Sequence, residues 1–236
     1  MTKMIVCERW EMELPEAAGD PWFLDWVLKA PHQRSTPAGC AAYQALAMVE
    51  PEMASATEYF GGVGAQSLMI HDLWAPAEHV AMDYTPEAAA HMAKLPGVKS
   101  FQANSYDPLE HRPAELVALD FGDFTVWKHR EGQQHRELID RVFADDPRGV
   151  VMTDVACRYL HLHRSRYETL LGEGRCNSYP DYLEALADRF EALYGYVMVG
   201  GFWHGRWSSV MAFAPEGERA AFAPAPASPV GLQVVP

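Results

Sequence analysis

The sequence predicts an α/β protein with a mostly parallel sheet, helices on both faces and a closing antiparallel hairpin. From residue 55 onward, short β-prone runs alternate with helix-length amphipathic segments, as in strands joined by crossover helices. The first of these runs ends in a glycine-rich turn that leads directly into a helical pattern. Two apolar, β-rich runs follow one another near the carboxyl end, which favours a hairpin.

Length and composition fit one domain of this class. The chain has 236 residues, of which 49% are hydrophobic and 22% charged, so it can bury a sizeable core. The formal net charge of -13 repels polyanions unless basic side chains gather on one face, which disfavours nucleic acid as a partner without excluding it.

Cysteine spacing and hydropathy indicate the compartment. The four cysteines are far apart and form no CxxC pair, which predicts free thiols in a cytoplasm; they are Cys7, Cys40, Cys157 and Cys176. No charged start precedes an apolar run, and no stretch approaches the roughly 18 to 20 apolar residues that cross a bilayer. We expect a cytoplasmic protein with no membrane association.

The elements follow in order along the chain. Residues 1–54 are expected to form a helical lead-in, because segments 21–30 and 36–50 space apolar side chains by three and four. Trp22 and Trp26 are expected to pack the first of these helices onto the domain. Thr36 followed by Pro37 fits a helix start.

Residues 55–215 are expected to form the main domain. Strands are expected near residues 56–60, 79–84, 97–103, 116–121 and 149–155, and helices from residue 65, from Thr85-Pro86, over 134–143, over 156–171 and over 178–194. Gly195 fits a helix C-cap, and residues 194–215 a hairpin. Residues 216–236 are rich in Pro and Ala and predict a flexible tail or a docking arm.

The glycine-rich turn carries the first functional signal. The sequence Glu58-Tyr59-Phe60-Gly61-Gly62-Val63-Gly64-Ala65 brings backbone close to a ligand and presents free amides at a helix start. Asp83 ends the next predicted strand nineteen positions after Gly64 (83 − 64), where an acid accepts hydrogen bonds from ribose hydroxyls. Together these signals indicate a nucleoside ligand. Ser67 stands where the dinucleotide fingerprint has its third glycine, which weakens an NAD interpretation.

The segment EYFGGVGA resembles the first motif of class I S-adenosylmethionine-dependent methyltransferases, and the order of the later motifs also matches over about residues 57–215. This resemblance implies a Rossmann-like sheet and S-adenosylmethionine as the cofactor. The cofactor-binding residues it implies are Glu58, Phe60, Gly61, Gly62, Gly64, Asp83, Tyr84, Asn104, Ser105 and Asp120. Within that set the glycine turn holds the amino acid part and the ribose, Asp83 the ribose hydroxyls, and Asn104 or else Ser105 the adenine.

The resemblance also implies that the residue leaving the fourth strand faces both the sulfonium and the methyl acceptor. Asp120 is the first candidate for this role and Asp123 the second. Methyl transfer is an in-line displacement, so a carboxylate there orients or deprotonates the acceptor. Asp154 ends the fifth strand on the same edge, where lining the acceptor pocket and capping the next helix are equally good interpretations.

The acceptor is left open as a nitrogen or oxygen atom, with a nucleic acid base as the leading candidate. Residues 120–122 have a faint likeness to the motif of transfer RNA guanine-N2 methyltransferases, but they lack its proline. No Pro-Cys follows the fourth strand, which excludes the cytosine-C5 class. Arg158, Arg164 and Arg166 form a basic cluster that either contacts phosphates or is a solvated helix face.

The histidines and the hairpin tip give weaker signals, and two other functions are open. His161 and His163 lack a third ligand, so no metal site is expected. Aromatic and cationic residues near the hairpin tip either stack on a ligand or belong to the core; these are Phe202, Trp203, Arg206 and Trp207. Two alternative functions remain, an NAD-dependent oxidoreductase and a non-catalytic methyltransferase-like module that assembles with itself or docks a partner through its tail.

Overall fold

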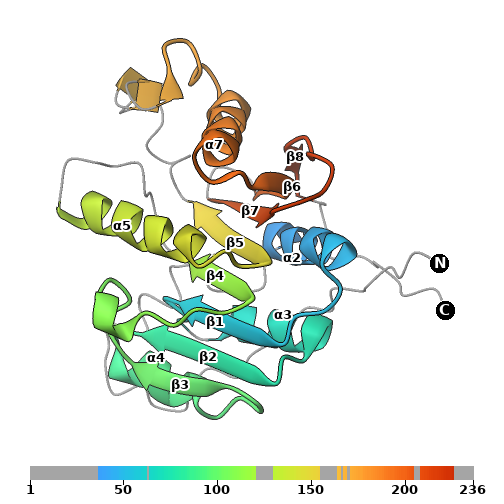
Figure 1. The fold of residues 1–236 in the computed structure, drawn as a ribbon. Coiled ribbons are helices and arrows are strands. Elements are labelled where there is room, and N and C mark those ends of the chain that lie inside the picture. Colours follow the sequence, from blue (N-terminus) through green and yellow to red (C-terminus); the bar gives the residue numbers. More distant parts are fainter. Residues whose placement is uncertain are drawn as a thin grey trace.

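The computed structural model describes residues 37–62, 64–120, 130–154, 164–165, 167–168, 171–204 and 208–225. Within these residues the chain forms one eight-stranded sheet, ordered β3-β2-β1-β4-β5-β7-β6-β8, with helices on both faces (Figure 1). The predicted lead-in helix over residues 21–30, with Trp22 and Trp26, lies outside this part of the chain.

The strands are β1 (Ser55–Tyr59), β2 (Glu78–Asp83), β3 (Lys99–Gln102), β4 (Leu116–Asp120), β5 (Gly149–Asp154), β6 (Val197–His204), β7 (Ser208–Ala214) and β8 (Ala223–Pro224). The helices are α2 (Pro37–Val49), α3 (Ala65–Trp74), α4 (Pro86–Met92), α5 (Arg130–Ala144) and α7 (Tyr179–Tyr194), with a short 3₁₀ turn, η2 (Pro108–Glu110). All five predicted strands and the helices expected at 36–50, 65, 85, 134–143 and 178–194 are present.

The first five strands pair in parallel, and β7 is antiparallel to both β5 and β6. The predicted Rossmann-like sheet with a C-terminal antiparallel hairpin is therefore confirmed. The chain moves outward from β1 through β2 to β3 and then returns to β4 on the other side of β1. At such a reversal of strand order, a crevice opens at the carboxyl ends of the strands, and ligands of open α/β sheets bind there.

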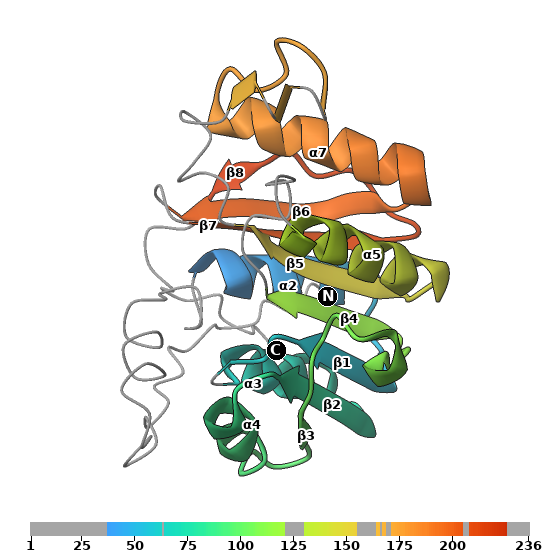
Figure 2. The ribbon, with the colours of Figure 1, turned by 90° about the vertical axis from the view of Figure 1, so that its left-hand side faces the viewer.

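Alternation along the strands, with a register shift in β6, divides the core between the two faces of the sheet. On one face Tyr59, Val117 and Leu119 pack with Leu138 and Ile139 of α5 and with the apolar side of α7. The opposite face carries the small residues of β1 and β4 beneath α2 and α3. Figure 2 shows α5 and α7 together on the first of these faces. Burying each large apolar side chain in these layers contributes about 1.5–3 kcal/mol.

The ends of α7 and α4 follow from local sequence in different ways. Ser178 and Asp181 form a reciprocal capping box at the start of α7, and Gly195 ends that helix in the left-handed conformation with φ 75°. Thr85 occupies the N-cap of α4 and Pro86 follows it, as predicted, but the Thr85 side chain does not cap the helix. Its hydroxyl is bound to Asp83 instead.

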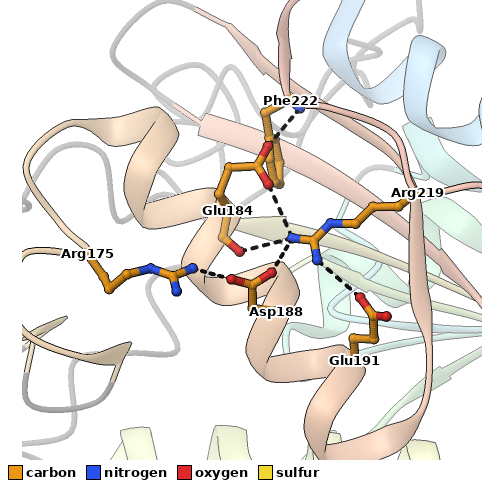
Figure 3. A network of polar contacts seen from close by, with 6 residues as sticks. All are labelled: Arg175, Glu184, Asp188, Glu191, Arg219 and Phe222. Carbon is orange, nitrogen blue, oxygen red and sulfur yellow. Dashed lines mark hydrogen bonds and ion pairs between the residues drawn. The ribbon is translucent and has the colours of Figure 1, made fainter.

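The first ten residues of the segment assigned to the tail fold back onto the domain. Arg219 binds three acids on one side of α7 (Figure 3): Glu184 at 3.2 Å, Asp188 at 2.6 Å and Glu191 at 3.1 Å. Arg175 pairs with Asp188 from the other side (Figure 3). Beyond Arg219, β8 adds a two-residue parallel strand to the edge of β6. Composition alone did not reveal this contact, and residues 226–236 lie outside the described chain.

The cysteines differ from the expectation of four free thiols. Cys176 is free and buried, but Cys40 is disulfide-bonded, with its partner outside the described residues. The prediction is therefore wrong for Cys40, because cysteines far apart in sequence can still meet in the fold and spacing does not exclude a bridge. Within the described chain, no helix combines the length and apolar character needed to span a bilayer.

Candidate functional site

Three carboxylates converge at the carboxyl ends of adjacent strands. Glu58 of β1, Asp83 at the end of β2 and Asp120 at the end of β4 are only 1%, 2% and 5% exposed. Strand alternation places Glu58 and Asp120 on the face covered by α2 and α3, because each is two residues from an alanine on that face. Asp83 lies on the same face, because Ala81, two residues before it, pairs with Glu58 in the sheet register. Three predicted site residues from separate parts of the sequence thus lie on one edge of the sheet, at the reversal of strand order.

The glycine-rich turn lies between β1 and α3 and has an unusual backbone. Phe60, Gly62 and Gly64 have φ values of 62°, 58° and 79°, in the left-handed region. A phenylalanine there is strained by about 1–3 kcal/mol, and such strain is common at ligand sites. The amide of Gly61 donates to the Met82 carbonyl at 2.9 Å, which ties the turn to the end of β2.

Close packing against the end of α4 and the turn that follows it explains two of the glycines. A Cβ on Gly61 would lie 2.5 Å from Sδ of Met92, and a Cβ on Gly64 2.5 Å from Cδ1 of Leu95. A side chain at Gly61 or Gly64 would therefore have to displace its neighbours, and glycine lets the backbone of the turn stay close to them.

Asp83 is held in one orientation by the turn and by the start of α4. Its Oδ2 accepts from the Gly62 amide at 3.0 Å, and its Oδ1 accepts from the amide and hydroxyl of Thr85 at 2.8 and 2.5 Å. An ionised carboxylate has about four acceptor sites, so three protein donors leave capacity for one more. The arrangement fits an acid that is pre-oriented for a hydroxyl group of a ligand.

Glu58 is the most enclosed of the three acids. Its Oε1 accepts hydrogen bonds from the Ser67 hydroxyl and from Nε2 of His79, the latter at 2.7 Å. Its Oε2 is buried and has no hydrogen-bond partner among the described residues. A buried carboxylate oxygen without a donor is costly and marks a place where a ligand donor fits.

The environment of Asp120 changes its acidity. Burial raises the pKa of Asp120 to about 7, hydrogen bonds from Thr153 and Gln66 partly offset that rise, and the charges of Glu58 and Asp83 add to it. Gln66 is oriented by Tyr43 of α2, whose hydroxyl donates to the Gln66 Oε1 at 2.6 Å. A carboxyl group with a pKa near neutrality exchanges protons readily at physiological pH.

The region that follows β3 borders the same edge. Asn104 accepts a hydrogen bond from the Tyr106 amide at 3.1 Å, and the buried Ser105 hydroxyl has no partner within the described chain. The Tyr106 ring lies 5.1 Å from that of Phe60. Tyr84 follows Asp83 and is 56% exposed. The residues predicted to contact the cofactor thus surround one part of the sheet edge.

Several predicted site residues lie elsewhere or outside the described residues. Asp123, Arg158, Arg166, Arg206, Trp207, His161 and His163 are outside the described ranges. Asp154 ends β5 and pairs with Ser209 of β7, and nothing further is described of it. Arg164 is exposed and binds Glu168 at 2.9 Å. Phe202 and Trp203 are half-buried and pack against opposite faces of the core, which favours the structural interpretation for both.

The sequence did not indicate that six further side chains support the acids. They are Tyr43, Gln66, Ser67, His79, Thr85 and Thr153. Alternation along β2 was a usable signal for His79, because it shares a face with Asp83. The contact between Tyr43 and Gln66 joins two helices, and no local pattern indicates it. Within the described residues, no group of three His, Cys, Asp or Glu side chains is arranged to hold a metal.

Comparison with known proteins identifies the fold. No protein-family model and no curated protein sequence matches the chain. Among solved structures, the plantazolicin methyltransferase BpumL in complex with a monoazolic desmethylPZN analog and SAH aligns with a TM-score of 0.53 at 9% identity, over 84% of this chain and 92% of that one. The N-methyltransferase NodS from Bradyrhizobium japonicum WM9, in complex with S-adenosyl-l-homocysteine, aligns with a TM-score of 0.50 at 14% identity, over 85% and 94%. The chain therefore has the fold of class I S-adenosylmethionine-dependent methyltransferases.

Proposed function

We propose that this chain, which has a class I methyltransferase fold, binds S-adenosylmethionine at the carboxyl ends of β1, β2 and β4 and transfers its methyl group to a nitrogen or oxygen atom. The observation that carries the proposal is the convergence of three buried, pre-oriented acids and a glycine turn at the reversal of strand order. Structural neighbours solved with S-adenosylhomocysteine support the choice of cofactor.

The residues present fit an adenosyl amino acid. Asp83 has remaining capacity for a ribose hydroxyl, and Glu58 keeps one buried oxygen without a donor, which suits an ammonium group. Asn104 and Ser105, with Tyr84 and Phe60 as flanking rings, are proposed to border the adenine. When bound, S-adenosylmethionine supplies an electrophilic methyl group on a sulfonium.

Asp120 is proposed to act on the acceptor. Its Oδ1 is buried and has no partner in the described part of the chain, and its pKa of about 7 lets it take a proton from an N–H or O–H group near neutral pH. Gln66 and Thr153 hold the carboxyl group in place while the acceptor approaches in line with the methyl group. Asp123 and Asp154 remain proposals for the acceptor side of the site.

Two features disfavour the NAD alternative. The Ser67 hydroxyl binds Glu58, so the position of the third dinucleotide glycine carries a structural side chain. In addition, β7 runs antiparallel to β5, which the methyltransferase resemblance implies, whereas the dinucleotide-binding sheet is mostly parallel.

The identity of the methyl acceptor and the cellular compartment are also proposed. A nucleic acid base is retained as the leading acceptor, with Arg158, Arg164 and Arg166 as its phosphate contacts, although Arg164 is already engaged by Glu168. Cytoplasmic localisation is likewise proposed, and the disulfide at Cys40 weighs against it because reducing compartments keep thiols free.

Incubation of the protein with S-adenosylmethionine labelled in its methyl group, against separate DNA, RNA, protein and metabolite pools, tests the proposal. We expect label to appear in one pool and to be lost in Asp120→Ala, with cofactor binding largely kept. Label transfer that persists in Asp120→Ala contradicts the role of this residue. If label appears in none of the pools, and if Asp120→Ala leaves self-assembly or partner binding intact, the result supports the non-catalytic module instead.

A further inference from the structure

A buried histidine contacts Glu58, the acid that precedes the glycine turn. His79 of β2 is fully buried, and its Nε2 lies 2.7 Å from Oε1 of Glu58. In the register of the sheet, His79 pairs with Ala56 and Glu58 pairs with Ala81, so the two side chains lie diagonally across the strands on one face. His79 is the second residue of β2, and a buried polar side chain is unusual in a parallel strand, where apolar residues predominate.

The two donors to Glu58 act on the same oxygen. Ser67 approaches from α3 and His79 from β2, and both bind Oε1. Against a carboxylate, the Ser67 hydroxyl and the Nε2–H of His79 can only donate. The carboxyl group is thereby fixed about one oxygen, and Oε2 is left buried with no donor among the described side chains.

The unequal hydrogen bonding of the two Glu58 oxygens is energetically unfavourable, and a ligand can relieve it. Leaving a buried carboxylate oxygen without a donor is unfavourable, because that oxygen has lost its water and has no partner in the protein to replace it. A ligand that brings a positively charged N–H to Oε2 recovers this energy as binding affinity. Losing His79 frees the carboxylate to rotate and to share its oxygens with Ser67, which reduces that gain.

We propose that His79 is a positioning residue that orients Glu58 so that Oε2 binds the α-ammonium group of an amino acid-bearing ligand. This inference rests on the proposed function, in which that ligand is S-adenosylmethionine or its product. It assigns His79 a selective role, because it affects recognition of the amino acid part and leaves recognition of the nucleoside part by Asp83 intact.

A pair of ligands separates the two parts. S-adenosylhomocysteine carries the ammonium group, and 5′-methylthioadenosine has the same thioether and nucleoside without the amino acid. Titration calorimetry of both ligands against wild type, His79→Leu and His79→Gln measures the effect. We expect His79→Leu to weaken S-adenosylhomocysteine about tenfold and to change 5′-methylthioadenosine less than twofold. In His79→Gln the side-chain amide donates to Glu58, so most of the loss is recovered.

His71→Leu is the matched control. The His71 ring lies 6.2 Å from the His79 ring, and its Nε2 has no hydrogen-bond partner within the described chain. We expect this variant to bind both ligands within twofold of wild type. If His79→Leu does not fold, Ser67→Ala removes the other donor, and we expect the same selective loss with it.

The outcomes distinguish this inference from the proposed function. Equal binding of S-adenosylhomocysteine by wild type and His79→Leu overturns the inference alone. An equal loss for both ligands, in His79→Leu or in Ser67→Ala, also overturns it, because it assigns the residue a purely structural role. Wild-type protein that binds neither ligand contradicts the proposed function itself.

Discussion

The pKa of Asp120 leads to a stability prediction that requires no knowledge of the acceptor. Burial, partly offset by hydrogen bonds from Thr153 and Gln66, raises this pKa from 3.8 to about 7. Between these values the folded protein keeps a proton that the unfolded chain has released. Folding stability from this group is therefore fully present below pH 3.8, falls by about 1.4 kcal/mol per pH unit as the pH rises from 3.8 to about 7, and is constant above that.

The substitution Asp120→Asn removes this titration and conserves shape. The difference of about three units (7 − 3.8) corresponds to an upper limit of about 4 kcal/mol at 1.36 kcal/mol per unit. We expect the free energy of unfolding of the variant, relative to wild type, to increase from pH 4.5 to pH 7 and then to level off. The amplitude is expected to reach about 2–4 kcal/mol, because the charged form no longer has to be buried.

Urea unfolding of both proteins at half-unit steps from pH 4.5 to 8.5 measures this difference, and other titrating groups cancel in it. Glu216→Gln is the control, since Glu216 is exposed and its substitution is expected to give a difference that is flat with pH to about 0.5 kcal/mol. A flat difference for Asp120→Asn refutes the argument, because it means that Asp120 is ionised at neutral pH at no cost.

Two further predictions concern packing and the C-terminal segment. Gly64 and Gly174 have similar φ values, 79° and 76°, but of the two only Gly64 has a neighbour, Leu95, that an added Cβ would collide with. We expect Gly174→Ala to lower the free energy of unfolding by about 1–2 kcal/mol and Gly64→Ala to lower it by about 1–3 kcal/mol more. Equal losses for the two variants in thermal unfolding contradict the packing argument. Arg219→Ala is expected to lower the free energy of unfolding by about 1–2 kcal/mol in low salt and by less in 0.5 M salt, and to expose the segment around β8 to limited proteolysis. Lys99→Ala breaks one exposed ion pair and is expected to lower it by under about 0.5 kcal/mol. Proteolysis that is unchanged in Arg219→Ala rules out the anchoring role of Arg219.

The sequence predicted the fold because its local signals agree with one another. Proline and an acid mark the start of α4, Gly195 marks the end of α7, and short β-prone runs mark the five parallel strands. The acids of the site were predictable because each one ends a strand or precedes the glycine turn. Their spacing in the chain reflects the length of a crossover unit.

The supporting side chains were less predictable because their contacts join elements that are distant in sequence. Tyr43 reaches Gln66 between two helices, and no periodicity specifies that pairing. The interaction of Arg219 with α7 similarly depends on a reversal of the chain after β7, which a Pro- and Ala-rich composition conceals. The sequence marked Thr85 as a helix start, but its hydroxyl donates to Asp83 and does not cap the helix. Carboxylates are strong acceptors, and this contact depends on the position of Asp83 in the fold.

Direct titration of the ligand tests the central claim most sharply. Calorimetry of the wild-type protein with S-adenosylhomocysteine and, separately, with NAD compares the two nucleoside ligands, and Asp83→Ala tests the site. We predict that S-adenosylhomocysteine binds the wild-type protein, that NAD does not, and that Asp83→Ala weakens binding at least about tenfold, or about 1.4 kcal/mol. Binding of NAD in place of S-adenosylhomocysteine, or affinity for S-adenosylhomocysteine that is unchanged in Asp83→Ala, contradicts the account.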